Sequence, residues 1–247
     1  MTERTGTRRS KGREENQRAM HSEQNEKIAK VLGITGGVGA GKSTILSYLR
    51  EQYGACILEA DKVGHQVQQP GEACWEQIKE KFGAEILKEN GTIDRERLGA
   101  VVYADRDKME QLNAIVHPAV KTRILEEIDV FRSRLSVSSE KALVSECKTQ
   151  KFPVLVIEAA LLLEDHYDAF CDEVWYVYAD EETRTRRLMK SRGYSREKIR
   201  QIMHNQLSEE EFRRRCQAVI DNSGEDMAHI CAQIDERIKC FLEEKDN

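Results

Sequence analysis

A glycine-rich loop between an apolar run and a helical pattern constrains the fold of this chain more than any other feature. The apolar run covers Val31 to Thr35, and the loop follows directly as Gly36-Gly37-Val38-Gly39-Ala40-Gly41-Lys42-Ser43. From Lys42 to Tyr53, apolar residues recur on one helical face. The pattern therefore predicts a strand, a tight loop and a helix in direct succession, as at the start of an α/β fold.

The loop matches the P-loop pattern, in which glycines let backbone N–H groups close around phosphate oxygens at the positive end of a helix. Lys42 supplies a mobile charge for the β- and γ-phosphates, and the Ser43 hydroxyl is placed to bind Mg²⁺. We therefore predict ATP and Mg²⁺ as cofactors, with Ser43 as the metal ligand. The predicted nucleotide-binding residues are Gly37, Val38, Gly39, Ala40, Gly41, Lys42, Ser43 and Thr44.

Four further apolar runs predict more strands of the same sheet. They cover Cys56 to Ala60, Val154 to Ile157, Val174 to Tyr178 and Ala218 to Ile220. Because helical patterns separate them, the sheet should be parallel and covered by helices on both faces. We predict a three-layer α/β/α P-loop NTPase fold with a five-stranded parallel sheet, in one domain over residues 28–242.

The long segment between the second and third predicted strands is almost entirely helical in pattern. Its predicted helices cover Cys74 to Phe82, Asp94 to Tyr103, Asp105 to Val116 and Pro118 to Arg134. His117 precedes a proline, which favours an extended residue at a helix start. A simple crossover needs only about a dozen residues. We therefore expect a helical substrate-binding insertion over about 62–150, ending in a surface loop, between core segments 28–61 and 151–242.

Composition limits the classes of protein to consider. Hydrophobic residues make up 39% and charged residues 34%, and the longest apolar run, Val154 to Leu163, is too short to span a membrane. The net charge of −5 disfavours a general nucleic-acid-binding surface. Residues 1–27 lack Val, Ile, Leu and Phe, so we expect a mobile tail. We expect a cytoplasmic protein without membrane or nucleic-acid partners, and its oligomeric state stays open.

Phosphoryl transfer needs a carboxylate near the accepting hydroxyl, and Glu59-Ala60-Asp61 ends the second predicted strand beside the P-loop. Alternation along a strand would place Glu59 and Asp61 on the same side, so either could face the γ-phosphate. Alternatively, Asp61 could cap the following helix. Glu158 and His117 each have a structural and a functional interpretation, and for His117 we favour the structural one.

Basic residues crowd the region after the fourth predicted strand, with Gly193 as a candidate hinge. Such donors stabilise the charge that develops in phosphoryl transfer, although most surface arginines are simply solvated. We predict an Arg-rich helical lid over about 181–207, with Arg187 as the first candidate and Arg184 and Arg192 after it.

The order and spacing of several motifs resemble the dephospho-CoA kinase family. The resemblance covers about residues 30–242 and is carried by Gly33 to Thr44, Glu59-Ala60-Asp61, His117-Pro118, Ala160 to Glu164 and Val219-Ile220-Asp221-Asn222. It implies phosphorylation of the ribose 3′-hydroxyl of dephospho-CoA, with Asp61 as general base, the insertion as CoA-binding part and Arg187 as the lid arginine. In departures from the family pattern, Glu59 replaces Asp, Ala160 replaces a frequent Pro, and Cys216-Gln217 replace a frequent Ala-Asp.

Two other functions remain as alternatives. Another small-molecule P-loop kinase, acting on a nucleoside, nucleotide or sugar acid, would share the P-loop, the carboxylate and the arginine lid. A nucleotide-dependent switch would be expected to carry a guanine-selecting N-K-x-D sequence, which this chain lacks. We therefore predict that Asp61, Lys42 and Arg187 are the catalytic residues of a dephospho-CoA kinase.

Overall fold

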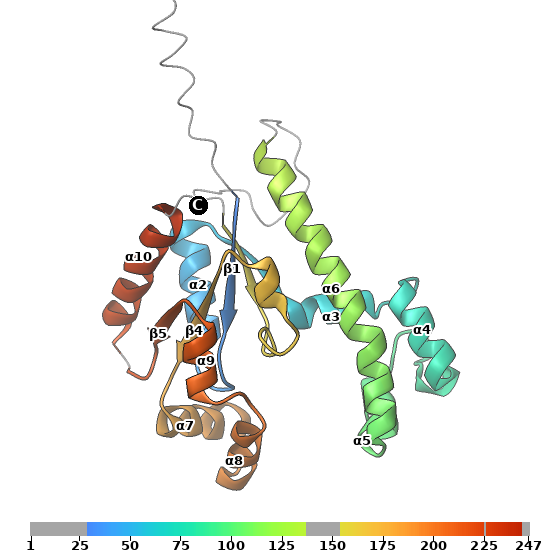
Figure 1. Ribbon diagram of the computed structural model, residues 1–247. Helices are drawn as coiled ribbons and strands as arrows, with labels where there is room; N and C mark the ends of the chain where they lie inside the picture. The colour runs from blue at the N-terminus through green and yellow to red at the C-terminus, as the bar shows by residue number, and fades with distance from the viewer. Residues whose placement is uncertain (1–28, 137–153, 225, 244–247) are drawn as a thin grey trace, which may run out of the picture.

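The computed structural model describes residues 29–136, 154–224 and 226–243. Its centre is a five-stranded parallel sheet in the order β2-β3-β1-β4-β5 (Figure 1). The strands are β1 (Lys30–Thr35), β2 (Cys56–Glu59), β3 (Val154–Glu158), β4 (Glu173–Tyr178) and β5 (Ala218–Asp221). The predicted five-stranded parallel fold is confirmed.

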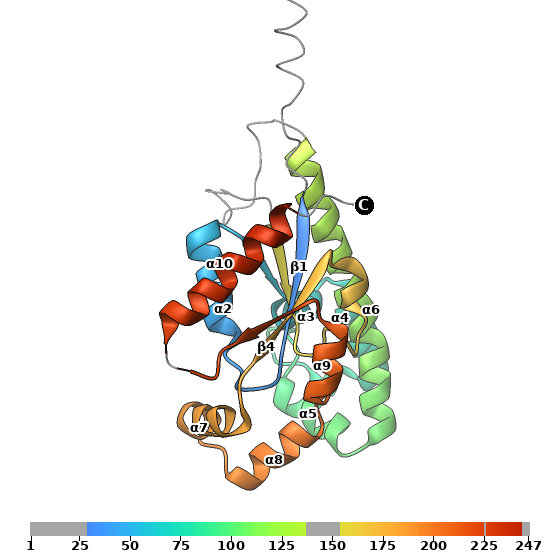
Figure 2. The ribbon, with the colours of Figure 1, turned by 60° about the vertical axis from the view of Figure 1, so that its left-hand side comes forward.

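Helices cover both faces of the sheet because the central strands are apolar on both sides. On one face, α2 (Lys42–Tyr53) and α10 (Met227–Glu243) bury Ile45, Leu49 and Ile234 against Leu32 and Trp175. Figure 2 shows these two helices side by side in front of the sheet. On the other face, Val31 and Leu155 join a second core that continues into the helical insertion. This arrangement gives the three layers.

The insertion consists of α3 (Ala60–Val67), α4 (Ala73–Phe82), the short η1 (Ala84–Ile86), α5 (Arg95–Tyr103) and the long α6 (Arg106–Ser136). Its core side chains include Val63, Ile78, Leu98 and Val120, in the same cluster as Leu155 of the sheet. In Figure 1 the lower half of α6 and the helices packed on it project away from the sheet.

Two local predictions are wrong. Pro118 lies inside one helix of 31 residues and does not separate two helices. Apolar residues on both sides of it, such as Leu112 and Ile124, belong to the same core cluster, so burial favours continuing the helix. In addition, Asp61 does not end β2, because the strand stops at Glu59 and α3 begins at Ala60.

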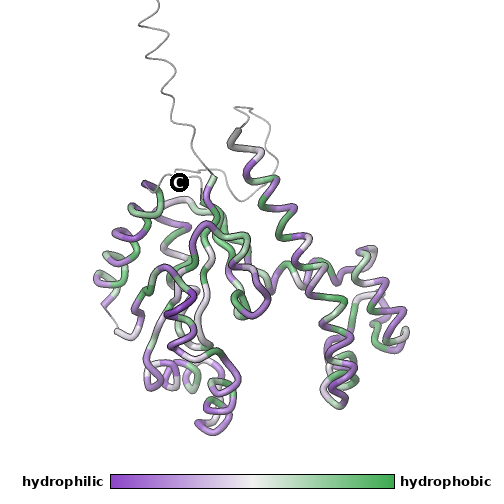
Figure 3. The backbone as a smooth tube through the Cα atoms, viewed as in Figure 1, coloured by the Kyte–Doolittle hydropathy of each residue, from purple (hydrophilic) through white to green (hydrophobic). Residues whose placement is uncertain are grey.

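The chain between β3 and β4 contains the short η2 (Tyr167–Phe170), and three helices follow β4: α7 (Glu181–Arg192), α8 (Arg196–His204) and α9 (Glu209–Arg215). Along α7 and α8 the backbone is coloured mostly as hydrophilic in Figure 3, whereas the strands are mostly apolar. Among the described residues, none of the helices combines the length and hydrophobicity that crossing a membrane requires. The tail over 1–27 and most of the predicted surface loop lie outside the described residues.

Candidate active site

The P-loop opens onto a cavity of about 610 Å³ at the carboxyl end of the sheet. Gly39 and Gly41 have φ angles of 80° and 86°, the left-handed region that favours glycine. Gly41 caps α2 without a side-chain hydrogen bond, so the first backbone N–H groups of that helix remain for a ligand. Gly37, Val38, Gly39, Gly41, Lys42 and Ser43 line the cavity, whereas Ala40 and Thr44 are not on its wall.

Lys42 lies between a backbone oxygen and an acidic side chain. Its Nζ donates to the Gly36 carbonyl at 2.9 Å and lies 3.5 Å from Oε1 of Glu158 at the end of β3. Burial raises the pKa of Glu158, the nearby Asp61 and Glu59 carboxylates raise it further, and Lys42 partly opposes them. The ammonium group is therefore directed into the cavity next to a carboxylate that is costly to ionise.

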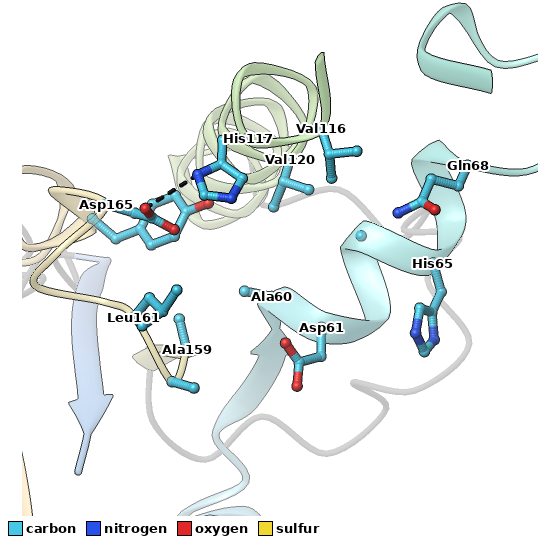
Figure 4. Close-up of a pocket in the computed structure, with 13 residues that line it drawn as sticks. Ala60, Asp61, His65, Gln68, Val116, His117, Val120, Ala159, Leu161 and Asp165 are labelled. Atoms are coloured by element: carbon cyan, nitrogen blue, oxygen red, sulfur yellow. Dashed lines mark ion pairs between the residues drawn. The ribbon is translucent and has the colours of Figure 1, made fainter. Parts of the chain in front are cut away.

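Asp61 lies on the wall shared by two cavities. It belongs to the first turn of α3 and lines both the P-loop cavity and a second cavity of about 390 Å³ (Figure 4). The capping interpretation is not supported, since the cap residue of α3 is Glu59 and no side-chain cap bond forms. Glu59 instead pairs with Lys62 at 2.8 Å. Asp61 is thus the carboxylate common to both spaces.

The second cavity lies between α3, α6 and the loop after β3. Its wall consists of Ala60, Asp61, Gly64, His65, Gln68, Val116, His117, Val120, Ala159, Ala160, Leu161, Asp165 and Tyr167. His117, placed by α6, lies against Asp165, with Nδ1 and Oδ1 3.2 Å apart. The structure therefore brings His117 into a pocket, although its sequence context alone favoured a structural role.

The three candidate arginines of α7 occupy different positions. Arg187 lines the P-loop cavity and donates to the backbone oxygens of Ala40 at 3.2 Å and Asn222 at 2.9 Å. Arg184 does not line this cavity; its Nε donates to the carbonyl of Val38 at 2.9 Å from outside the loop. Arg192 is exposed on the cavity wall. Only Arg187 is thus both on the cavity and bonded to the P-loop.

Sequence reasoning did not single out the roles of Gln206, which lines the P-loop cavity, and Asn222; both side chains bond to the P-loop backbone. Gln206 Oε1 accepts from the Val38 N–H at 3.1 Å and from Arg184 at 2.8 Å. Asn222, which is 2% exposed, donates from Nδ2 to the Ala40 carbonyl at 2.7 Å. Asn222 follows β5 at the carboxyl edge of the sheet, and that position was a usable signal.

Comparisons with known proteins find dephospho-CoA kinases. A family model described as dephospho-CoA kinase matches residues 30–227. A dephospho-CoA kinase from Geobacter sulfurreducens is 38% identical over 194 residues, covering 78% of this chain and 90% of the relative. One from Geobacillus kaustophilus is also 38% identical over 194 residues, covering 78% and 88%.

Solved structures share the fold. A crystal structure from Thermus thermophilus matches with a TM-score of 0.68 and 27% identity, covering 88% of this chain and 100% of that chain. A dephospho-CoA kinase from Campylobacter jejuni matches with a TM-score of 0.61 over 86% and 97%, and at 21% identity it shows the fold alone. With the family model and the two relatives covering most of the chain, the predicted family is confirmed: this chain belongs to the dephospho-CoA kinase family.

Proposed function

We propose that this chain transfers the γ-phosphoryl group of ATP to the ribose 3′-hydroxyl of dephospho-CoA, giving CoA and ADP. Membership of the family implies a nucleotide-using kinase with an alcohol as acceptor. One observation carries the assignment of roles within the site. The P-loop cavity and the α3–α6 cavity meet at Asp61, so donor and acceptor approach each other at one carboxylate.

The donor side uses the P-loop. Backbone N–H groups around Gly39 and Gly41 hold the phosphate chain, and Lys42 moves from Glu158 to the β- and γ-phosphates. The Ser43 hydroxyl and the nearby carboxylate oxygens fit Mg²⁺, which prefers oxygen ligands. When bound, Mg²⁺ would neutralise the charge that develops on the phosphates.

Asp61 orients the 3′-hydroxyl and accepts its proton as the oxygen attacks phosphorus. In loose phosphoryl transfer the proton moves late, so alignment contributes more than basicity. Arg187 has backbone partners on one side and the cavity on the other, and it directs its remaining donors to the transferring group. We propose in addition that the segment over about 181–207 acts as the lid, that the insertion over about 62–150 binds CoA, and that the protein is cytoplasmic.

Asp61→Asn tests the central assignment. We expect ATP binding to persist while kcat for dephospho-CoA falls by roughly 10² to 10⁴, the range for losing a general base. Asp61→Glu should not restore full activity, because the extra methylene moves the carboxylate away from the acceptor oxygen. Glu59→Gln is the matched control, since Glu59 lies two residues before Asp61 and pairs with Lys62. Near-normal turnover by Asp61→Asn together with inactive Glu59→Gln would move the base to Glu59.

The acceptor is tested separately. ADP release should be measured with ATP, Mg²⁺ and a panel containing dephospho-CoA, nucleosides, nucleotides and sugar acids. We expect turnover with dephospho-CoA to exceed the others by orders of magnitude. Faster turnover of a nucleoside or sugar acid would favour the alternative of another small-molecule kinase.

A further inference from the structure

A histidine–aspartate pair joins the two sides of the α3–α6 cavity. His117 comes from the middle of α6, whereas Asp165 comes from the loop that leaves β3, and their Nδ1 and Oδ1 atoms are 3.2 Å apart. The side chains are 42% and 22% exposed, so both lie at the wall of the pocket within reach of a ligand. In Figure 4 the edge of the imidazole away from Asp165 faces the pocket.

The pair determines which hydrogen-bonding group the ring presents. In the neutral form of the ring, a carboxylate beside Nδ1 favours the tautomer with its proton there, because a carboxylate only accepts hydrogen bonds; the lone pair of that tautomer lies on Nε2. His65, the other histidine of this wall, differs, because its Nε2 is 2.6 Å from Nη1 of Arg95, which can only donate. His117 therefore offers a hydrogen-bond acceptor to a ligand, and that ligand must present an N–H or O–H group.

The rest of the wall, here called the slot, is mostly apolar. Small residues, Ala60 and Gly64, line it on α3, and Val116 and Val120 face them from α6. A slot of this kind fits a flat ring with few polar contacts at its edge. If the reacting hydroxyl lies at Asp61, the nucleobase attached to the same ribose lies one sugar away from Asp61. The adenine of the acceptor is then the flat group nearest this slot.

We propose that His117, oriented by Asp165, is a specificity-determining residue that accepts a hydrogen bond from the exocyclic amino group of the acceptor's adenine. This inference rests on the proposed function. An oxo group in place of the amino group would bring two hydrogen-bond acceptors together, the oxo oxygen and Nε2 of His117. Asp165 keeps the imidazole from changing tautomer to accommodate the oxo group.

The test compares kcat/KM for dephospho-CoA with kcat/KM for its hypoxanthine analogue, in which an oxo group replaces the amino group. The wild-type protein should prefer dephospho-CoA by roughly tenfold or more. In His117→Ala the preference should fall to about one. In Asp165→Asn the imidazole stays but its tautomer is no longer fixed, so the preference should fall several-fold. KM for ATP should change little in either variant.

His229→Ala is the matched control, because His229 is exposed in α10, away from the pocket; its preference should equal that of the wild type. If His117→Ala fails to fold, Asp165→Asn decides the question. A wild-type preference near one, or an unchanged preference in folded variants, would overturn this inference and leave the proposed function standing. Failure of the wild-type protein to phosphorylate either acceptor would refute the proposed function and this inference with it.

Discussion

Pro118 is a costly residue at its position, and replacing it should stabilise the protein. It lies in the interior of α6, where it cannot donate to the carbonyl of Ala114 one turn earlier. Proline in a helix interior is less favourable than alanine by about 3 kcal/mol. Pro118 and Ala114 are both exposed, so water satisfies part of the missing hydrogen bond. We therefore expect Pro118→Ala to raise the free energy of unfolding by about 1–3 kcal/mol.

This gain should be visible in thermal unfolding followed by circular dichroism. For a chain of this size, 1 kcal/mol shifts Tm by about 2–4 °C, so Pro118→Ala should raise Tm by about 2–12 °C. Pro118→Gly restores the same N–H with a poorer helix former and should gain less. Pro70→Ala is the matched control, because Pro70 lies in an exposed turn after α3 and its replacement should leave Tm unchanged or slightly lower.

Pro118→Ala should also carry a functional cost. His117 is the adjacent residue, and a change in the backbone of α6 at residue 118 would alter the position of its ring relative to Asp165. We expect KM for dephospho-CoA to rise several-fold while KM for ATP is retained. A lower Tm for Pro118→Ala would refute the reasoning, since it would mean that the surrounding packing requires the local geometry of proline.

Three further predictions concern the P-loop cavity. Gln206→Met removes the hydrogen-bond acceptor shared by the Val38 N–H and Arg184 and should raise KM for ATP roughly tenfold. Gln201→Met, at an exposed position of α8, is the control and should leave KM for ATP unchanged. Equal effects of the two substitutions would contradict the role of the Gln206 contact. Arg187→Ala should lower kcat more than ATP affinity, as measured by steady-state kinetics and ATP titration, and a change in KM alone would show a ground-state contact. Glu158 has a raised pKa in the folded protein, so its contribution to stability is full at low pH and is lost as pH rises through that pKa. Glu158→Gln should therefore be more stable than wild type at neutral pH and should lose less stability as pH rises from the acidic range, which urea unfolding would measure; identical pH profiles would contradict this.

Much of the fold and the donor site followed from local patterns. The P-loop, the five strands and most helices each occupy a short segment whose spacing of apolar and glycine residues is readable on its own. The helix boundary placed at Pro118 was wrong because a local preference of about 3 kcal/mol competes with apolar packing along the whole of α6. No local pattern reports that packing.

The contacts that position the P-loop could not be predicted from local sequence patterns, for another reason. Gln206 and Asn222 bond to Val38 and Ala40 across 168 and 182 residues of sequence. Spacing along the chain says nothing about such pairs until the order of the strands is known. The end of β2 was also set by tertiary structure. Glu59 is opposite Glu158, the last residue of β3, in the register of the sheet, and beyond that point β2 has no neighbouring residue on β3 and the chain forms a helix.

The helical position of Asp61 determines which part of the molecule it packs with. A residue at the end of β2 would be fixed to the sheet and therefore to the P-loop. Asp61 instead belongs to α3, whose buried Val63 shares a core with Val120 of α6. The proposed base and two walls of the proposed acceptor pocket thus share one core, which also includes Val31 and Leu155 of the sheet. Because α3 carries Asp61 and α3 and α6 both line the acceptor pocket, a change in the packing between these helices would alter the position of the base and the shape of the pocket together, and therefore the alignment on which phosphoryl transfer depends.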